Sequence, residues 1–293
     1  MTLPCSITPR LPNTARVTGP YLQTLLDAAR ERGVTPDALA HAAGLAPGTL
    51  DPPPATLPTA RYLALLDAGA RLADDPFFGL HVGEQVRPAT YSAYGLMLLA
   101  SSSFGHALAL AQRYESLAHD LGRSRLAIEG PHALHEWISR YPDATRHLAE
   151  SVYAGIRVFG SWMAGRPLTP LALHFRHADP GHGHDEYLRV LGVAPTFDAP
   201  CHGAAFDVAL LAMPVPNADT SLFPVLHQHA ERLLAQRAMA ADDIVARVTT
   251  ALTARLPDGQ ARLGPVAAEL GLSARTLQRK LADAGSSFQQ VLD

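Results

Sequence analysis

Residues 265–285, PVAAELGLSARTLQRKLADAG, restrict the possible folds of this chain more than any other segment. Gly271 supplies a turn conformation that a side chain would resist. The Ser273 hydroxyl can cap a helix that begins just after it. The segment therefore predicts two short helices, 264–270 and 274–284, joined by a tight turn.

The second of these helices has an apolar face and a face rich in hydrogen-bond donors. The apolar face consists of Leu277, Leu281 and Ala284, at i, i+4 and i+7. The outer face carries Arg275, Gln278, Arg279 and Ala282. Guanidinium and amide groups pair bidentately with guanine and adenine edges in the DNA major groove. This combination favours a helix-turn-helix whose second helix reads DNA over a merely solvated helical hairpin.

The composition of the chain limits what else it can be. The 293 residues carry a net charge of -3, so binding to nucleic acid would come from a local patch. Hydrophobic residues at 47% allow a sizeable core, and charged residues at 17% argue against disorder. Cys5 and Cys201 are too far apart for a metal-ligand pair or a disulfide framework. With neither a signal peptide nor a membrane-spanning run, we expect a cytoplasmic protein without membrane contact.

The hydropathy pattern predicts an α+β fold. The first 120 residues read as helices, and the next 90 or so as a small antiparallel sheet packed on helices. An all-helical C-terminal part with the helix-turn-helix follows. The predicted parts are a flexible tail (1–16), an effector domain (17–215, helical over 17–120 and α+β over 121–215), a linker or dimerisation helix (216–240) and a partial DNA-binding domain (241–293, helix-turn-helix 264–284).

The segment GLSARTLQRKLADAGSSFQQVLD strongly resembles the first helix-turn-helix of the AraC/XylS family of bacterial transcription regulators. Upstream, DPFFGLHVGE, YGLMLLASSSFGHALALAQRY and PVPNADTSL are similar to a branch with an arabinose-binding-like effector domain. The resemblance implies a ligand-responsive regulator that binds double-stranded DNA, forms a homodimer and contacts RNA polymerase in the full-length parent. The implied base-reading residues are Arg275, Gln278 and Arg279, and the implied phosphate contacts are Thr276, Lys280 and Ser273.

One departure from the family pattern concerns the C-terminus. Family members have two helix-turn-helix units joined by a rigid helix, whereas this sequence stops at Asp293, within SFQQVLD. We expect a shortened chain that lacks the second unit. Loss of half the phosphate contacts should weaken DNA binding and flatten its salt dependence.

The middle region is the predicted site of a small-molecule pocket, because helices over an open sheet leave a concave apolar space. The candidate lining residues are Trp137, Tyr153, Arg157, Trp162, His174 and Phe175. Arg157 or His174 could pair with a carboxylate, and the resemblance implies a small metabolite or a fatty-acid-like effector. The alternative for each of these residues is an ordinary place in the core.

A second class of function also has to be considered. The segment HADPGHGHDEY (177–187) gathers histidines and carboxylates that could bind zinc, although a solvated polar turn fits its glycines and proline better. The alternative is therefore a small-molecule sensor or a metal-dependent enzyme with an incidental basic helix. No HExxH, CxxC, nucleophile elbow, Walker loop or GxGxxG supports it. We predict no catalytic residues, no metal and no cofactor.

Overall fold

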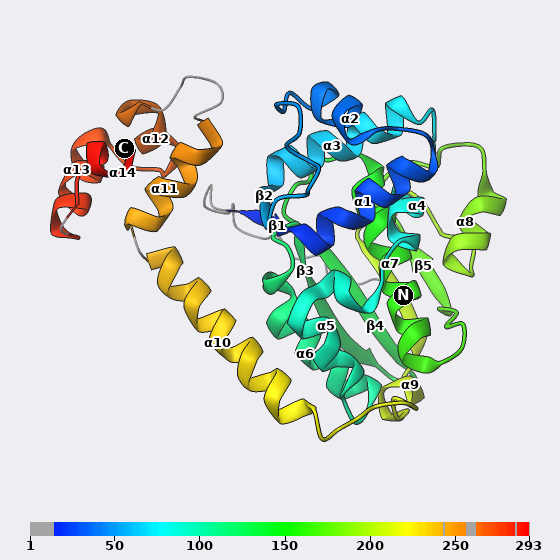
Figure 1. Cartoon of the computed structure of the whole chain (residues 1–293). Coiled ribbons are helices and arrows are strands. Elements are labelled where there is room, and N and C mark those ends of the chain that lie inside the picture. The colour runs from blue at the N-terminus through cyan, green and yellow to red at the C-terminus, as the bar shows by residue number, and fades with distance from the viewer. Residues whose placement is uncertain (1–14, 243, 256–261, 285, 293) are drawn as a thin grey trace.

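The computed structural model describes residues 15–242, 244–255, 262–284 and 286–292. Figure 1 shows a larger N-terminal body, a long helix that leaves it, and a small helical body at the C-terminal end. The α+β class predicted from the sequence is confirmed, with a helical first part, a small antiparallel sheet and a helical C-terminal part.

The first part of the chain is mainly helical, with one small ribbon. Its helices are α1 (Gly19–Glu31), α2 (Pro36–Ala42), α3 (Thr59–Leu72), α4 (Phe78–Glu84), α5 (Ser92–Leu99) and α6 (Phe104–Tyr114), with the short 3-10 helices η1 (Pro88–Tyr91) and η2 (Glu115–Leu117). Strands β1 (Arg16–Thr18) and β2 (Thr56–Pro58) pair antiparallel at the start of α1 and α3. The sequence pattern predicted neither this ribbon nor α4, because each is formed by packing against distant segments.

Local capping explains where several helices begin. Thr35 accepts a hydrogen bond from the backbone of Ala38, and Pro36 occupies the first turn of α2, as its sequence predicts. The segment LPTARYL predicts Thr59 as the cap of α3 by the same rule, and this prediction is wrong. Thr59 is the first residue of that helix rather than its cap, and the side chain of the preceding Pro58 makes no capping bond.

The sheet has four strands in the order β3-β4-β6-β5, and all three neighbouring pairs are antiparallel. Its strands are β3 (Gly122–Glu129), β4 (His132–Ser139), β5 (Ala172–His174) and β6 (His202–Asp207). The runs RSRLAIEG and HALHEWISRY alternate in part and predict a hairpin. Strands β3 and β4 form it, and Gly130 makes its turn with φ at 56°. Gly122 has to be a glycine, since a Cβ there would lie 2.4 Å from the ring of Trp137.

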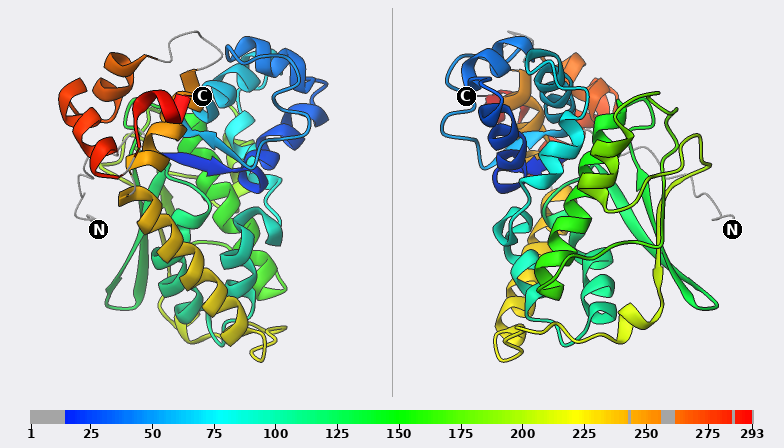
Figure 2. Two further views of the ribbon diagram at one scale, coloured as in Figure 1. Left: turned by 60° about the vertical axis from the view of Figure 1, so that its left-hand side comes forward. Right: turned by 90° about the vertical axis from the view of Figure 1, so that its right-hand side faces the viewer.

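Helix α7 (Arg146–Ala164) runs through the centre of the larger body and ends at Gly165, which has the left-handed conformation. Helix α4 packs closely on α7 through two glycines. A Cβ on Gly79 or Gly83 would come within 2.5 Å of α7 atoms. Figure 2 shows the helices stacked on one side of the sheet. Two further helices, α8 (His184–Leu191) and α9 (Ala209–Ala212), lie in the connections between strands or just after them.

The C-terminal part begins with the long helix α10 (Phe223–Asp242). It continues with α11 (Ile244–Arg255), α12 (Leu263–Glu269), α13 (Ala274–Asp283) and α14 (Phe288–Leu292). Among the described residues, most buried apolar side chains fall into two clusters, one in the larger body and one shared by α11, α12 and α13. Side chains of α14 pack against this second cluster. The small body therefore has a hydrophobic core of its own.

Candidate effector cavity and DNA-reading helix

Helices α12 and α13 form the helix-turn-helix expected from the sequence. Gly271 has φ at 68° in the turn, and Ser273 Oγ accepts the backbone N–H of Thr276 at 3.1 Å. Leu277 and Leu281 are fully buried and fix the inner face of α13 in the second cluster. The turn and the cap thus set the direction in which the second helix leaves the first.

The outer face of α13 is open to solvent. Arg275, Gln278, Arg279 and Lys280 are all exposed. Within the described residues, these four side chains take part in no hydrogen bond or ion pair. Thr276 is half-buried, and its hydroxyl lies 2.8 Å from that of Ser273. The donors predicted to face DNA are therefore gathered on one face and not engaged by the protein.

A cavity of about 140 Å³ lies between the sheet and helices α5, α6 and α7. This volume is roughly ten times what a single buried water requires. Most of the wall is apolar. The apolar lining includes Leu98, Phe104, Leu108, Leu126, Val152, Ile156, Phe159, Met163, Leu168, Leu173, Phe206, Leu210 and Leu211. The cavity is large enough for a small organic molecule with a mainly apolar body.

The polar lining is concentrated in a few buried side chains. Glu115, His119 and His135 are each at most 6% exposed. Burial raises the pKa of Glu115 to about 7, and it lowers the pKa of His119 to about 3 and that of His135 to about 4. The two histidines are therefore neutral at physiological pH, and Glu115 is the one acidic residue among the lining residues.

The six predicted pocket residues divide into two groups. Tyr153 and Arg157 line the cavity from α7. Nη1 of Arg157 donates to the Val190 carbonyl at 2.9 Å, while its Nε has no hydrogen-bond partner among the described residues. Burial lowers the pKa of Arg157.

The other four predicted residues do not belong to the cavity wall. Trp137 and Phe175 are fully buried behind it, and the Trp137 backbone N–H donates to the Tyr153 hydroxyl. His174 is half-buried in β5. Trp162 is 58% exposed, because it lies on the side of α7 that turns away from the sheet. The sequence does not reveal this side, since helical spacing alone does not fix which face meets the sheet.

The sequence analysis did not single out Glu115 or His119 as cavity residues, although a signal was present. Leu108, Ala111 and Glu115 follow one another at i, i+3 and i+7, and His119 comes one turn later. All four line the cavity. An ionisable pair that continues an apolar helical stripe therefore indicated a buried polar site here.

The comparisons with known proteins agree with this architecture. Residues 33–215 match the family model of the arabinose-binding domain of AraC transcription regulators, N-terminal. The chain belongs to the AraC family of transcription regulators. A similar curated protein is the ornithine utilization regulator of Pseudomonas aeruginosa, which is 30% identical over 278 residues, or 93% of this chain and 80% of that protein.

Two further relatives of this AraC-family chain are HTH-type transcriptional regulators of Mycobacterium bovis and Mycobacterium tuberculosis. Each is 29% identical to this chain over 301 residues, and the match spans 96% of this chain and 84% of the relative. Among solved structures, the transcriptional regulator CdpR of Pseudomonas aeruginosa matches with a TM-score of 0.50 at 20% identity, over 92% of this chain and 81% of CdpR. This structural likeness supports the fold.

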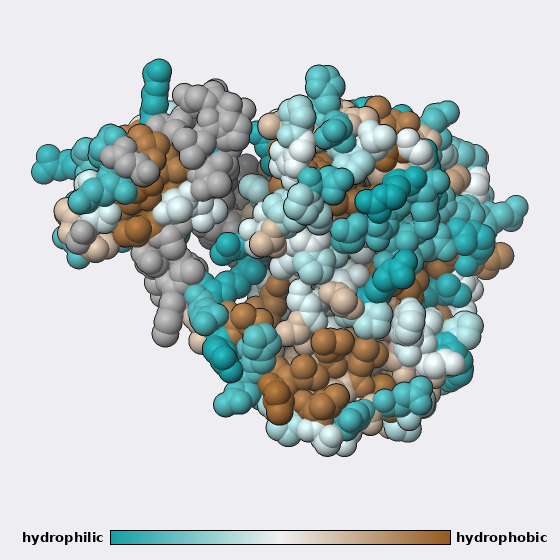
Figure 3. All heavy atoms as spheres, viewed as in Figure 1, coloured by the Kyte–Doolittle hydropathy of each residue, from teal (hydrophilic) through white to brown (hydrophobic). Residues whose placement is uncertain are grey.

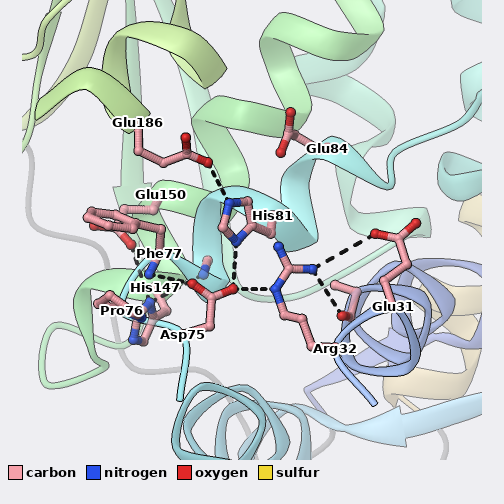
Figure 4. A network of polar contacts seen from close by, with 12 residues as sticks. Glu31, Arg32, Asp75, Pro76, Phe77, His81, Glu84, His147, Glu150 and Glu186 are labelled. Carbon is pink, nitrogen blue, oxygen red and sulfur yellow. Dashed lines mark hydrogen bonds and ion pairs between the residues drawn. The ribbon is translucent and has the colours of Figure 1, made fainter. Parts of the chain in front are cut away.

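A network of charged residues joins α4 and α8 of the AraC-family chain at its surface (Figure 4). His81 lies between two carboxylates, with Nδ1 2.6 Å from Asp75 and Nε2 2.6 Å from Glu186. Arg32 also pairs with Asp75. Arg189 bridges Glu186 and Glu84. The network ties helices together that are distant in sequence.

His81, Glu84 and Glu186 are close enough to hold a metal ion. Their existing contacts explain them without one, because both ring nitrogens of His81 already face carboxylates. The histidine-rich loop considered for zinc behaves differently. His184 pairs with Asp179 at 2.9 Å on the exposed surface. His182 contacts the Pro180 carbonyl. These are the contacts of a solvated turn.

No helix in the described ranges is both long and apolar enough to cross a bilayer.

Proposed function

We propose that this AraC-family chain is a ligand-responsive regulator whose cavity binds a small-molecule effector and whose α13 reads the DNA major groove. The observation that carries the DNA part is the open donor face of α13. Its arginine and glutamine side chains are exposed and have no partner among the described residues, while its leucines are held in the small core. A recognition helix needs this division between an anchored face and a reading face.

Within this proposal, Arg275, Gln278 and Arg279 contact base edges. Ser273, Thr276 and Lys280 contact phosphates, which position the helix without specifying sequence. Ser273 and Thr276 stand at the N-terminus of α13, where hydroxyl and backbone donors favour an anion. Arg255 is paired with Glu269 and is not assigned to DNA.

The cavity supports the sensing part. It combines an apolar wall with a small number of buried polar groups, which is typical of sites that orient one small molecule. Arg157 is the lining residue that could receive the carboxylate of a metabolite or a fatty-acid-like effector. The name of the Pseudomonas relative makes ornithine and other amino acids compounds to test first.

Helix α10 offers a route from the cavity to the DNA-binding part. The segment from Tyr114 to Asp120 has Glu115 in the cavity wall, and other residues of the same segment hold α10. Tyr114 donates to Glu231, and Arg237 pairs with Asp120. An effector that shifts η2 would therefore change how α10 is held, and it would favour one arrangement of the two bodies.

The proposed assembly is a homodimer that works with RNA polymerase, as the family pattern implies. Figure 3 shows an apolar patch on the larger body over the region of α5 and α6. Leu96, Leu222 and Val225 are exposed by 45%, 52% and 68%. Apolar groups of this kind at the start of α10 would be covered by a second copy.

The DNA assignment is tested with Arg275→Ala and Gln278→Ala. We expect each change to reduce discrimination between the operator and unrelated duplexes by about 1–3 kcal/mol, because each removes a base contact. Fluorescence anisotropy at fixed salt, with duplexes from the DNA upstream of the chain's own gene, measures this difference.

Lys280→Ala serves as the matched variant. It should weaken binding to all sequences alike and reduce the salt slope by about one, as expected for a phosphate contact. If the two base-contact variants keep full discrimination, the basic helix is incidental. The sensor or enzyme alternative then takes the place of the regulator.

A further inference from the structure

One end of the cavity is built around a buried carboxylate. Glu115 lies on η2 and is 6% exposed. Its two oxygens accept hydrogen bonds from the Ser124 backbone N–H at 2.8 Å and from the Ser124 hydroxyl at 3.1 Å. A carboxylate has about four acceptor positions, so Glu115 can accept further donors from a molecule in the cavity.

Three tyrosine rings surround this end. Tyr21, Tyr91 and Tyr94 all line the cavity, with ring centroids 6.3 Å apart for Tyr21 and Tyr91 and 5.4 Å apart for Tyr91 and Tyr94. Burial raises the pKa of each of these tyrosines, and the negative charge of Glu115 adds to the effect. Tyr21 lies beside His119, and Nε2 of His119 is 3.9 Å from an oxygen of Glu115, so the group of tyrosine rings adjoins the carboxylate.

Two neutral imidazoles complete the polar wall. Nδ1 of His119 and Nδ1 of His135 are buried and have no hydrogen-bond partner among the described residues. Each neutral ring can offer one acceptor nitrogen. The His119 ring also lies beside the Tyr21 ring at a tilt, with ring centroids 4.6 Å apart. This end of the cavity consequently has unused acceptors and aromatic faces.

Two cations near Glu115 are not part of the cavity lining. Arg123 and Arg140 act on Glu115 electrostatically, but neither belongs to the cavity lining. Arg123 donates to the side chain of Asp120 and to the backbone carbonyl of His119. Arg157, the cation that does line the cavity, donates to the Val190 carbonyl of α8. The lining around Glu115 thus combines negative charge with aromatic rings and supplies no cation.

Building on the proposed effector role of the cavity, we propose that the Glu115 end binds the protonated amino group of an organic amine, whose apolar part fills the rest. An ammonium group has three donors, which match the carboxylate and the two imidazoles. Tyrosine faces attract cations, and more strongly where water is excluded. A carboxylate placed at this end would instead meet the like charge of Glu115.

Three probes of the same shape test this inference on the whole chain. They are n-hexylamine, 1-hexanol and hexanoate, compared by the shift in melting temperature that each produces at pH 8. A ligand that binds the folded chain raises its melting temperature, and a tighter ligand raises it more. We therefore expect n-hexylamine to stabilise the chain most, because it is the one probe of the three that can form an ion pair with Glu115. Hexanoate should stabilise the chain less than n-hexylamine, because its carboxylate can pair only with Arg157 and is repelled by the charge of Glu115 at the other end.

Glu115→Gln removes the charge and keeps an amide of nearly the same shape beside Ser124. It should weaken n-hexylamine binding by on the order of tenfold or more and leave 1-hexanol binding unchanged. Glu129→Gln is the matched control, because Glu129 is exposed on β3 and does not line the cavity, so n-hexylamine binding should stay as it is. If the Glu115 variant does not fold, the wild-type chain provides the measurement. Its affinity for n-hexylamine should rise between pH 6 and 8 as Glu115 ionises.

The outcomes separate this inference from the proposed function. Equal n-hexylamine affinity in wild type and Glu115→Gln, a flat pH dependence, or stronger stabilisation by hexanoate would overturn the amine assignment. In the last case the cavity still binds effectors, and the proposed function stands. If none of the three probes stabilises the chain, the amine assignment is wrong. If ornithine, other amino acids and longer fatty acids also fail to stabilise the chain, the effector role of the cavity fails as well.

Discussion

At Asp75, burial and hydrogen bonding have opposite effects on one carboxyl group. Burial alone would raise its pKa, but hydrogen bonds from His81 and from the Phe77 backbone, together with Arg32, lower it to about 2. The Arg189 guanidinium likewise lowers the pKa of Glu186 to about 2. Burial would lower the pKa of His81, yet its two carboxylate partners raise it. His81 is therefore charged over a wider pH range than a free histidine.

The first prediction at this scale concerns His81→Gln. A histidine whose pKa is raised on folding stabilises the fold fully below its unfolded pKa of about 6.5, and the contribution is lost as the pH rises through the folded pKa. The free energy of unfolding of the wild type should exceed that of the variant by about 2 kcal/mol near pH 6, and this difference should shrink toward pH 9. Urea unfolding of both chains across this range measures it.

His229→Gln is the control, because His229 is exposed on α10. The free energy of unfolding of His229→Gln should stay close to that of the wild type across the range. At each pH, the free energy of unfolding of the variant has to be subtracted from that of the wild type. The buried His119 and His135 have lowered pKa values and add a stability loss of their own at low pH. A pH-independent difference for His81→Gln would show that its charge does not stabilise the fold.

At the scale of elements, the helix-turn-helix depends on one backbone conformation and one cap. Gly271 has positive φ, which costs an L-amino-acid side chain energy even where space is free, and space around it is free. Ser273 Oγ then accepts the backbone N–H of Thr276 in the first turn of α13. The orientation of the donor face thus depends on two residues that lie outside that face.

Gly271→Ala should destabilise the small C-terminal body by about 1–2 kcal/mol, because it forces a Cβ into the left-handed region. Gly264→Ala is a matched control. Gly264 lies in α12 with open space around its Cα and no positive φ, so alanine should stabilise the helix by about 0.5–1 kcal/mol. Thermal unfolding followed by circular dichroism compares the two. Equal effects of both changes would argue against a strained turn.

Over the whole molecule, two separate cores are joined by one long helix. Helix α10 contacts α5 and η2 of the larger body and leads into α11 of the smaller one. Glu231 on α10 pairs with Arg113 at 2.8 Å and accepts the hydroxyl of Tyr114. Arg237 pairs with Asp120 and donates to the Ser116 carbonyl. These contacts are the physical link between the cavity wall and the helix that leads to the small C-terminal body.

Arg237→Ala should loosen α10 from the larger body. Asp120 keeps Arg123 as a partner, so we expect the larger body to remain folded. The amides of α10 should exchange with solvent faster by on the order of tenfold, the effect of losing a charge-assisted contact. Hydrogen–deuterium exchange by mass spectrometry measures this, and Arg232→Ala, at an exposed position on the same helix, is the control. Unchanged exchange in both variants would remove the proposed route.

The sequence alone determined the elements whose signal is local. Leucine spacing, Gly271 and Ser273 specified α12, the turn and α13, because helix periodicity and capping act over a few residues. The β3–β4 hairpin and the α+β class were predictable for the same reason. The short strand pair β1–β2 and helix α4 were not, because each is formed by packing against distant segments.

The cavity was decided by the tertiary structure. Tyr21, Tyr91, Glu115 and His135 come from four separate elements, and only the packing of helices on the sheet brings them together. The same packing turned Trp162 outward and kept Tyr153 and Arg157 inside. A sequence specifies which side chains share a face of a helix. Which face packs against the sheet is decided by the fold, because burial is a property of the whole assembled core.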